Sequence, residues 1–375
     1  MASASILSSV TFVPIYLDEI GATNDFIVIT VAIYAFFAFL SSMTFGRLAD
    51  RPNLGRKVFI KLGLLFSTGT FIFQFFLTTP EGLLLTRVLA GFAVGIYPGA
   101  MFSYAFETGH KLGKFSAFGS LGWSFGSLIA GLLATLFPTN SVFLLSGLFF
   151  FISFLFVLRL EGGDMAYSPP SSQLAIRPSA TDVFRNNSGL YLSFFVRHSA
   201  TNAIWTLWPI FLRAELSFDN VEIGIIQATN AGTQFLVMIL FTDSRRSFLL
   251  YEFGAFLSGV TFISFLVTKE FVLFLGTQIL LGISWGTMFV GAVRFIAEKN
   301  DVNARSTASG YLTGIIMVSQ CIGPLYVYLI LLFFPGSLAY YIIIIFAAAM
   351  SFFSVLSFLL YYQWRTKGEP SLIPA

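Results

Sequence analysis

Long apolar runs, separated by short polar or Gly/Pro-containing stretches, follow one another along almost the whole chain. About 20 apolar residues are enough for a helix to cross a bilayer. The pattern therefore predicts an all-α, polytopic integral membrane protein with twelve transmembrane helices. We expect them at 3–18, 25–45, 57–78, 82–106, 115–137, 141–159, 189–212, 221–242, 247–267, 271–296, 307–334 and 338–362.

The composition supports a lipid environment. Of the 375 residues, 56% are hydrophobic and only 10% are charged, whereas soluble domains carry about 25% charged residues. The single cysteine, Cys321, cannot form an internal disulfide and is expected to be a buried thiol. Residues 1–17 lack the basic segment of a cleavable signal sequence, so we interpret them as the first span.

A Pro/Ser-rich stretch divides the predicted spans into two sets of six. It predicts a six-helix bundle at 1–160, a cytoplasmic linker at 161–187, and a second six-helix bundle with a short tail at 188–375.

Lysine and arginine are distributed unevenly between alternate loops. One set of loops, together with the C-terminal tail, carries 17 of the 21 basic residues, and the other set carries only Arg213 and Lys269. Basic loops stay in the cytoplasm. The bias predicts a multi-pass protein of the cell membrane with both termini cytoplasmic.

The two halves of the sequence match each other at an offset of 191 residues. The matched pairs are Gly91/Gly282, Gly95/Gly286, Glu107/Glu298, Lys114/Arg305 and Gly119/Gly310. Six spans bring both halves into the membrane from the same side, so we expect two pseudo-symmetric bundles related by an axis along the membrane normal. Such repeats place a substrate site near the midplane between them.

The loop after the second span carries a recognisable motif. It reads Gly-Arg-Leu-Ala-Asp-Arg-Pro-Asn-Leu-Gly-Arg-Lys over residues 46–57 and closely resembles the loop signature of the major facilitator superfamily. The resemblance implies that this gating motif latches the two bundles in the outward-facing state. Its residues are Gly46, Asp50, Arg51, Gly55, Arg56 and Lys57.

Two further patterns resemble features of that family. Arg87 lies in a stretch similar to the fourth-span pattern of proton-coupled members, although Ala90 replaces a glutamine, and this implies a coupling role. The series Gly122, Gly126, Ser127 and Gly131 resembles a fifth-span antiporter pattern, with Ser127 in place of proline. Small residues at this spacing also serve ordinary helix packing, so both interpretations stay open.

Ionisable groups within a span are site candidates, because a charge at the bilayer centre is costly. Arg87, Arg197 and His198 are the clearest, and no acid lies near the middle of a predicted span. This asymmetry favours an anionic or polar substrate, with carbonyl and amide partners for the arginines as the alternative. The candidate substrate-binding residues are Arg197, His198, Asn202, Trp205, Gln227, Asn230, Gln234, Gln278 and Trp285.

These features predict a secondary active transporter of a small molecule that works by alternating access as a monomer, with a proton as the candidate coupling ion. The sequence has no nucleotide-binding loop, no cluster of metal ligands and no cofactor motif, and nothing in it points to an enzyme or to nucleic-acid binding. Multidrug efflux and the uptake of anions, organic acids or sugars are alternatives within the family. A transport-inactive membrane sensor or scaffold is the alternative outside it.

Overall fold

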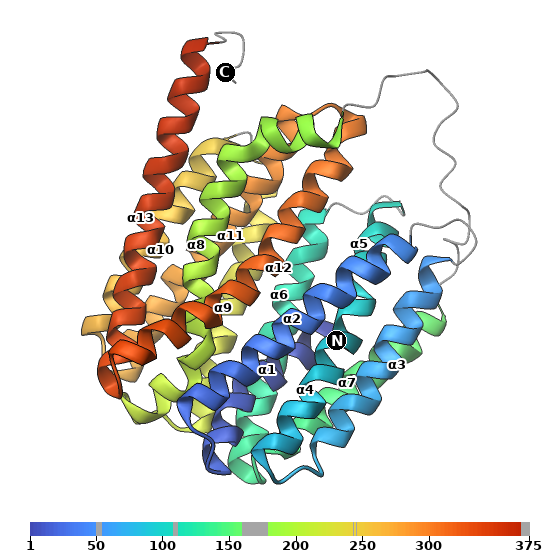
Figure 1. The fold of residues 1–375 in the computed structure, drawn as a ribbon, viewed down its shortest axis with the longest axis vertical. Coiled ribbons are helices and arrows are strands. Elements are labelled where there is room, and N and C mark those ends of the chain that lie inside the picture. The colour runs from blue at the N-terminus through green and yellow to red at the C-terminus, as the bar shows by residue number, and fades with distance from the viewer. Residues whose placement is uncertain (50–54, 108–111, 160–178, 243, 245, 369–375) are drawn as a thin grey trace.

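A computed structural model describes residues 1–49, 55–107, 112–159, 179–242, 244 and 246–368. These ranges form thirteen helices (Figure 1). They are α1 (Ala2–Glu19), α2 (Asn24–Ala49), α3 (Arg56–Gln74), α4 (Pro80–Ile96), α5 (Pro98–Glu107), α6 (Leu112–Leu136), α7 (Ser141–Leu158), α8 (Ala180–Ala214), α9 (Asn220–Phe241), α10 (Ser247–Val267), α11 (Phe271–Lys299), α12 (Val302–Phe333) and α13 (Ser337–Gly368).

Thirteen helices correspond to twelve spans, because α4 and α5 share the span predicted at 82–106. The break at Tyr97 arises from Pro98, which has no N–H to donate and starts the next helix instead. By length and composition, nine segments in the described ranges are able to cross a membrane, and α4 with α5 counts as one of them. The twelve-helix membrane fold is therefore confirmed, with one interrupted span.

Helix α8 begins earlier than the hydrophobic pattern indicates. The predicted linker reaches residue 187, yet the helix starts at Ala180. Tertiary contacts explain the extension: the buried amides of Asn187 and Asn300 exchange two hydrogen bonds of 3.0 and 3.1 Å. Packing has thus extended the helix through residues that carry no apolar run.

The helices form two groups, α1–α7 and α8–α13, which lie side by side (Figure 1). The same close contact recurs in each group. A Cβ on Gly91 would lie 2.4 Å from the backbone oxygen of Tyr34, and a Cβ on Gly282 would lie 2.7 Å from that of Asn230. Only glycine permits such a close approach of α2 to α4 and of α9 to α11.

A second contact repeats at the same offset of 191 residues. Gly63 of α3 packs on Tyr97, where its Cβ would lie 2.8 Å from the Tyr97 Cβ. Gly254 of α10 packs on Met288, at 2.7 Å by the same measure. The internal repeat read from the sequence is therefore visible as repeated helix packing.

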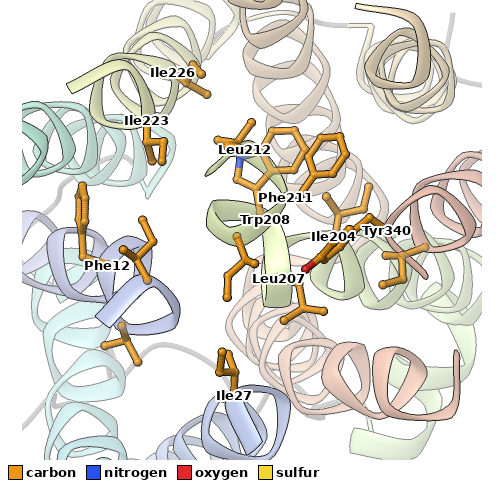
Figure 2. Packing of buried hydrophobic residues seen from close by; sticks show 14 of the residues in the cluster. Phe12, Ile27, Ile204, Leu207, Trp208, Phe211, Leu212, Ile223, Ile226 and Tyr340 are labelled. Carbon is orange, nitrogen blue, oxygen red and sulfur yellow. The ribbon is translucent and has the colours of Figure 1, made fainter. Parts of the chain in front are cut away.

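One hydrophobic core joins the two groups at the end of the molecule where α1 and α8 finish. Phe12 of α1 and Ile27 of α2 belong to the same buried cluster as Leu207 of α8 and Tyr340 of α13. Figure 2 shows these residues gathered around α8. We call this the closed end.

Polar contacts also cross between the groups at the closed end. Arg213 Nη1 donates to Glu19 Oε1 at 2.7 Å, and Asn220 Nδ2 donates to the Ala134 carbonyl at 2.9 Å. The ion pair is well exposed, with side-chain exposures of 39% and 31%. Exposed pairs contribute about 0–1 kcal/mol, so the apolar core stabilises this end more than the ion pair does.

The opposite end, where α7 stops and α8 starts, is built differently, and we call it the linker end. One core cluster contains only residues of α2–α7 with partners from α1, among them Leu64 and Tyr97. Another contains only residues of α8–α13, among them Tyr191 and Phe295. The groups therefore share a large core at the closed end. Toward the linker end most core residues lie in two separate clusters, and a small cluster of Ala117 from α6 with Met238 and Val290 from α9 and α11 joins the groups.

Candidate functional site

Arg197 lies in the interior of the second group and is 1% exposed. Its Nε and Nη2 donate to Ser258 Oγ of α10 at 3.0 and 2.7 Å. Ser258 in turn lies 2.5 Å from Ser284 Oγ of α11. The guanidinium also lies 5.5 Å from the ring centre of Trp285. Arg197 is thus directed toward α10 and α11, with serine hydroxyls as its partners.

His198 stacks on Trp285. Their ring centres are 4.8 Å apart and their planes differ by 25°, and Phe194 completes the aromatic group. Neither imidazole nitrogen has a hydrogen-bond partner among the described residues. Because adjacent helical residues point about 100° apart, Arg197 and His198 reach different partners while Trp285 contacts both.

The candidate amides Gln227, Asn230 and Gln234 are spaced three and four residues apart, so they form a stripe on one face of α9, and this stripe reaches the first group. Gln234 Nε2 donates to Asn230 Oδ1 at 2.7 Å, and Ser120 Oγ of α6 donates to Gln234 Oε1 at 3.2 Å. Gln227 is buried on the same helix. The stripe therefore lies at the junction of α6 and α9, where the two groups meet.

The other candidates lie apart from this cluster. The Asn202 amide donates to the His198 carbonyl of its own helix at 2.8 Å, and its Cβ lies against Gly323 of α12. Trp205 meets Trp208 edge to face at 5.5 Å. Gln278 is fully buried and donates to Thr277 Oγ1 at 3.3 Å. Among the nine candidates, the structure brings together Arg197, His198 and Trp285, and separately Asn230 and Gln234.

Arg87 is 2% exposed inside the first group. Its Nη1 donates to Ser9 Oγ of α1 at 3.2 Å, and its guanidinium carbon lies 3.9 Å from the ring centre of Tyr34 on α2. Within the described ranges no carboxylate oxygen lies within 4 Å of Arg87 or Arg197. Each helix group thus buries one cation beside aromatic rings without a paired acid.

The loop motif lies only partly within the described ranges. Asp50 and Arg51 fall outside them. Gly55 precedes α3 with φ of 62°, a backbone conformation that favours glycine. Gly46 has open space around it, and Arg56 and Lys57 begin α3. The latch role of this motif stays a prediction.

Sequence reasoning missed the serine partners of Arg197. The repeat itself carries the signal: Gly254, Ser258 and Phe262 match Gly63, Ser67 and Phe71 at the offset of 191 residues. Extending the repeat into α3 and α10 would have placed a serine and a phenylalanine beside the buried arginine. Both Ser258 and Phe262 contact Arg197.

Comparison with known proteins adds sequence relatives. Residues 1–196 match the family model described as Major Facilitator Superfamily. Multidrug resistance protein MdtG of Klebsiella pneumoniae is 28% identical over 218 residues, which cover 54% of this chain and 52% of that protein. Multi-drug resistance efflux pump PmrA of Streptococcus pneumoniae is 27% identical over 229 residues, which cover 57% and 56%. The chain thus spans about half the length of these curated relatives.

Solved structures share the fold over nearly the full chain. The nucleoside transporter NupG superposes with a TM-score of 0.67 at 15% identity and covers 96% of this chain and 98% of that one. The human organic anion transporter MFSD10 gives 0.69 at 12% identity, with 95% and 96% covered. A bacterial homologue of Spinster, described as inward-facing and unoccupied, gives 0.70 at 14% identity, with 95% and 96% covered. At these identities the likeness describes the fold alone.

Proposed function

This chain belongs to the Major Facilitator Superfamily, and on that premise we propose that it is a secondary active transporter that moves a small molecule by alternating access. The observation that carries the proposal is the difference between the two ends. One large core joins the groups at the closed end, whereas two separate cores serve the linker end and the small cluster of Ala117, Met238 and Val290 is the joint core there in the described ranges. This is the arrangement expected of one of the two states that alternating access requires.

The positive-inside rule assigns the linker end to the cytoplasm. The described state is then inward-facing, in a multi-pass protein of the cell membrane with both termini cytoplasmic. A monomer suffices for the mechanism, because both groups belong to one chain. A proton is the proposed coupling ion, and Arg87 is a residue through which coupling would act.

We place the substrate between α8, α9 and α11, beside Trp285, His198 and the amides of Asn230 and Gln234. Arg197 Nε and Nη2 both donate to Ser258 of α10. Aromatic faces and amides, without a free charge, favour a largely apolar molecule with an aromatic part. The relatives named as multidrug proteins support the same substrate class.

An organic anion is the second candidate substrate. The observation in its favour is that Arg87 and Arg197 are both buried without a paired carboxylate in the described ranges. Their positive charges would attract an anion to the centre of the membrane.

Thermal stabilisation of the purified protein separates these candidates. Ligand binding adds RT ln(1 + [L]/Kd) to stability, which is about 2.7 kcal/mol at 100 times Kd. The probes are tetraphenylphosphonium, benzoate and a neutral sugar. Stabilisation by tetraphenylphosphonium that is lost in Trp285→Ala and kept in Arg197→Gln would support the aromatic substrate class. Stabilisation by benzoate that is lost in Arg197→Gln would support the anion instead.

Transport itself is tested in proteoliposomes with the stabilising probe. We expect an imposed pH gradient to drive faster initial uptake of the probe into proteoliposomes than into protein-free vesicles, which these membrane-permeant probes also enter. Accumulation that is independent of the gradient would remove the proton from the proposal, and binding without any flux would favour a sensor.

A further inference from the structure

We infer that the first helix group binds a small monovalent anion, with the size and charge of chloride, between Arg87 and Gln74. This site goes beyond the proposed function, because it lies inside one group and does not depend on which substrate is carried.

Arg87 has spare hydrogen-bonding capacity. Ser9 accepts from Nη1 and Tyr34 covers one face of the guanidinium. Its Nε–H is buried and has no partner in the described part of the chain. A buried donor without an acceptor is destabilising, and an acceptor that also carried negative charge would remove this cost.

One face of α3 supplies further unpaired polar groups. Ser67, Phe71 and Gln74 are spaced four and three residues apart, so they share a face. The amide nitrogen and oxygen of Gln74 and the hydroxyl of Ser67 are buried without partners in the described ranges. Gln74 is 0% exposed. Both polar atoms of this fully buried amide are therefore available to a ligand.

The helix register brings Gln74 to Arg87. Gly63 of α3 packs on Tyr97 at the end of α4, and Phe71 lies 6.0 Å from the Arg87 guanidinium. The two helices run in opposite directions, so eleven residues beyond Gly63 correspond to about eleven residues before Tyr97. Helical side chains lean toward the start of their own helix, so Gln74 and Arg87 lean toward each other.

The second group shows the same niche filled by protein. Ser258 and Phe262 match Ser67 and Phe71, and there Arg197 uses Ser258 as the acceptor for two of its N–H groups. In the first group Ser67 has no partner, because the arginine arrives from α4 instead of the helix equivalent to α8. The first group thus leaves the Arg87 Nε–H and the Ser67 hydroxyl without partners, whereas Arg197 and Ser258 pair with each other.

The chemistry of the unpaired atoms selects an anion. Arg87 Nε, Gln74 Nε2 and Ser67 Oγ can all donate, and Gln74 Oε1 is restricted to accepting. The niche also carries the uncompensated charge of Arg87, with no described carboxylate within 4 Å. Donors around a buried cation stabilise a negative charge.

The test measures the melting temperature of the purified protein while chloride replaces gluconate at a constant ionic strength of about 0.3 M. We expect a saturable rise of about 2 °C or more in the unmodified protein. The rise should disappear in Arg87→Gln, and the half-saturating chloride concentration should increase about tenfold in Gln74→Leu, which loses one donor to the ion. The matched control Gln278→Leu, which changes a buried amide of the second group, should keep the original half-saturation.

Crystals soaked in bromide provide a second measurement that does not depend on the stability of a variant. The expected result is an anomalous peak beside Arg87. Equal melting temperatures in chloride and gluconate, together with no bromide peak at Arg87, would overturn the inference. So would stabilisation by benzoate but by no halide, because the anionic group would then be part of the substrate.

Discussion

Gly131 holds the closed end together, because it lies where α6 of the first group crosses α9 of the second. A Cβ at this position would lie 2.6 Å from the Asn220 backbone oxygen and 2.9 Å from the Gly224 Cα. Both neighbours are backbone atoms and cannot turn aside. We therefore predict that Gly131→Ala separates α6 from α9 and shifts the protein away from the state with a joined closed end.

The size of the effect follows from the geometry. Ordinary contact begins at 3.4 Å, so the helices must separate by roughly 0.8 Å, and overpacking of this kind costs about 1–3 kcal/mol. A cost of that size changes a two-state population about 5- to 150-fold. The state with the joined closed end, if it dominates in the unmodified protein, would then coexist with the alternative state in Gly131→Ala.

Spin labels at Asp25 and Ala214 report the distance across the closed end. Both positions are exposed, and Cys321→Ser removes the native thiol. Double electron–electron resonance should show one short distance between the two labels in the protein with Gly131, and an additional longer distance in Gly131→Ala. Gly119→Ala is the control on the same helix, because its Cβ would meet only Ser3 Oγ at 3.6 Å. Identical distance distributions in the two variants would refute the reasoning.

Three further tests address other contacts. Ser258→Ala leaves two buried N–H groups of Arg197 without an acceptor and should lower the free energy of unfolding by about 1.5–3 kcal/mol. Ser258→Thr should restore the melting temperature. An unchanged melting temperature in the alanine variant would contradict the assigned hydrogen bonds. Exchanging the charges with Glu19→Arg and Arg213→Glu together should change stability by less than about 1 kcal/mol, while either substitution alone should lower the melting temperature at low salt and not at high salt. Phe12→Ala removes a fully buried ring from the joined core and should cost about 3–5 kcal/mol in denaturant unfolding, so a cost below about 1 kcal/mol would place Phe12 outside that core.

Much of the fold was accessible from the sequence, because a bilayer imposes a strict length on every helix. The predicted spans agree with the observed helices to within a few residues, except that α12 starts at Val302 and α13 ends at Gly368, five and six residues beyond the prediction. The larger differences lie around Tyr97 and at the start of α8. In both places a local feature overrides the hydrophobic pattern: Pro98 ends one helix, and the paired amides of Asn187 and Asn300 extend the other.

The site was less accessible, because polar and apolar residues are spread around all sides of α8 and give no signal of which face points inward. Arg197 and His198 were both predicted as substrate-binding candidates, and the sequence did not show that Arg197 bonds to Ser258 of α10 while His198 stacks on Trp285 of α11. The closed end could not be predicted either, because alternating states of one chain use the same residues and differ by only a few kcal/mol.

The glycine contacts have a mechanical consequence. At Gly91 and Gly282 the backbones of neighbouring helices touch without an intervening side chain, so α2 cannot slide on α4, nor α9 on α11, without breaking steric contact. Each pair behaves as a stiff rod about 30 Å or more in length. A small rotation of a helix pair about one of its ends therefore displaces its other end by several ångströms. If the contact within either pair were loosened, the two helices would move relative to each other and the rotation would not reach the far end. The protein would then still bind its substrate but would not open the opposite end to release it.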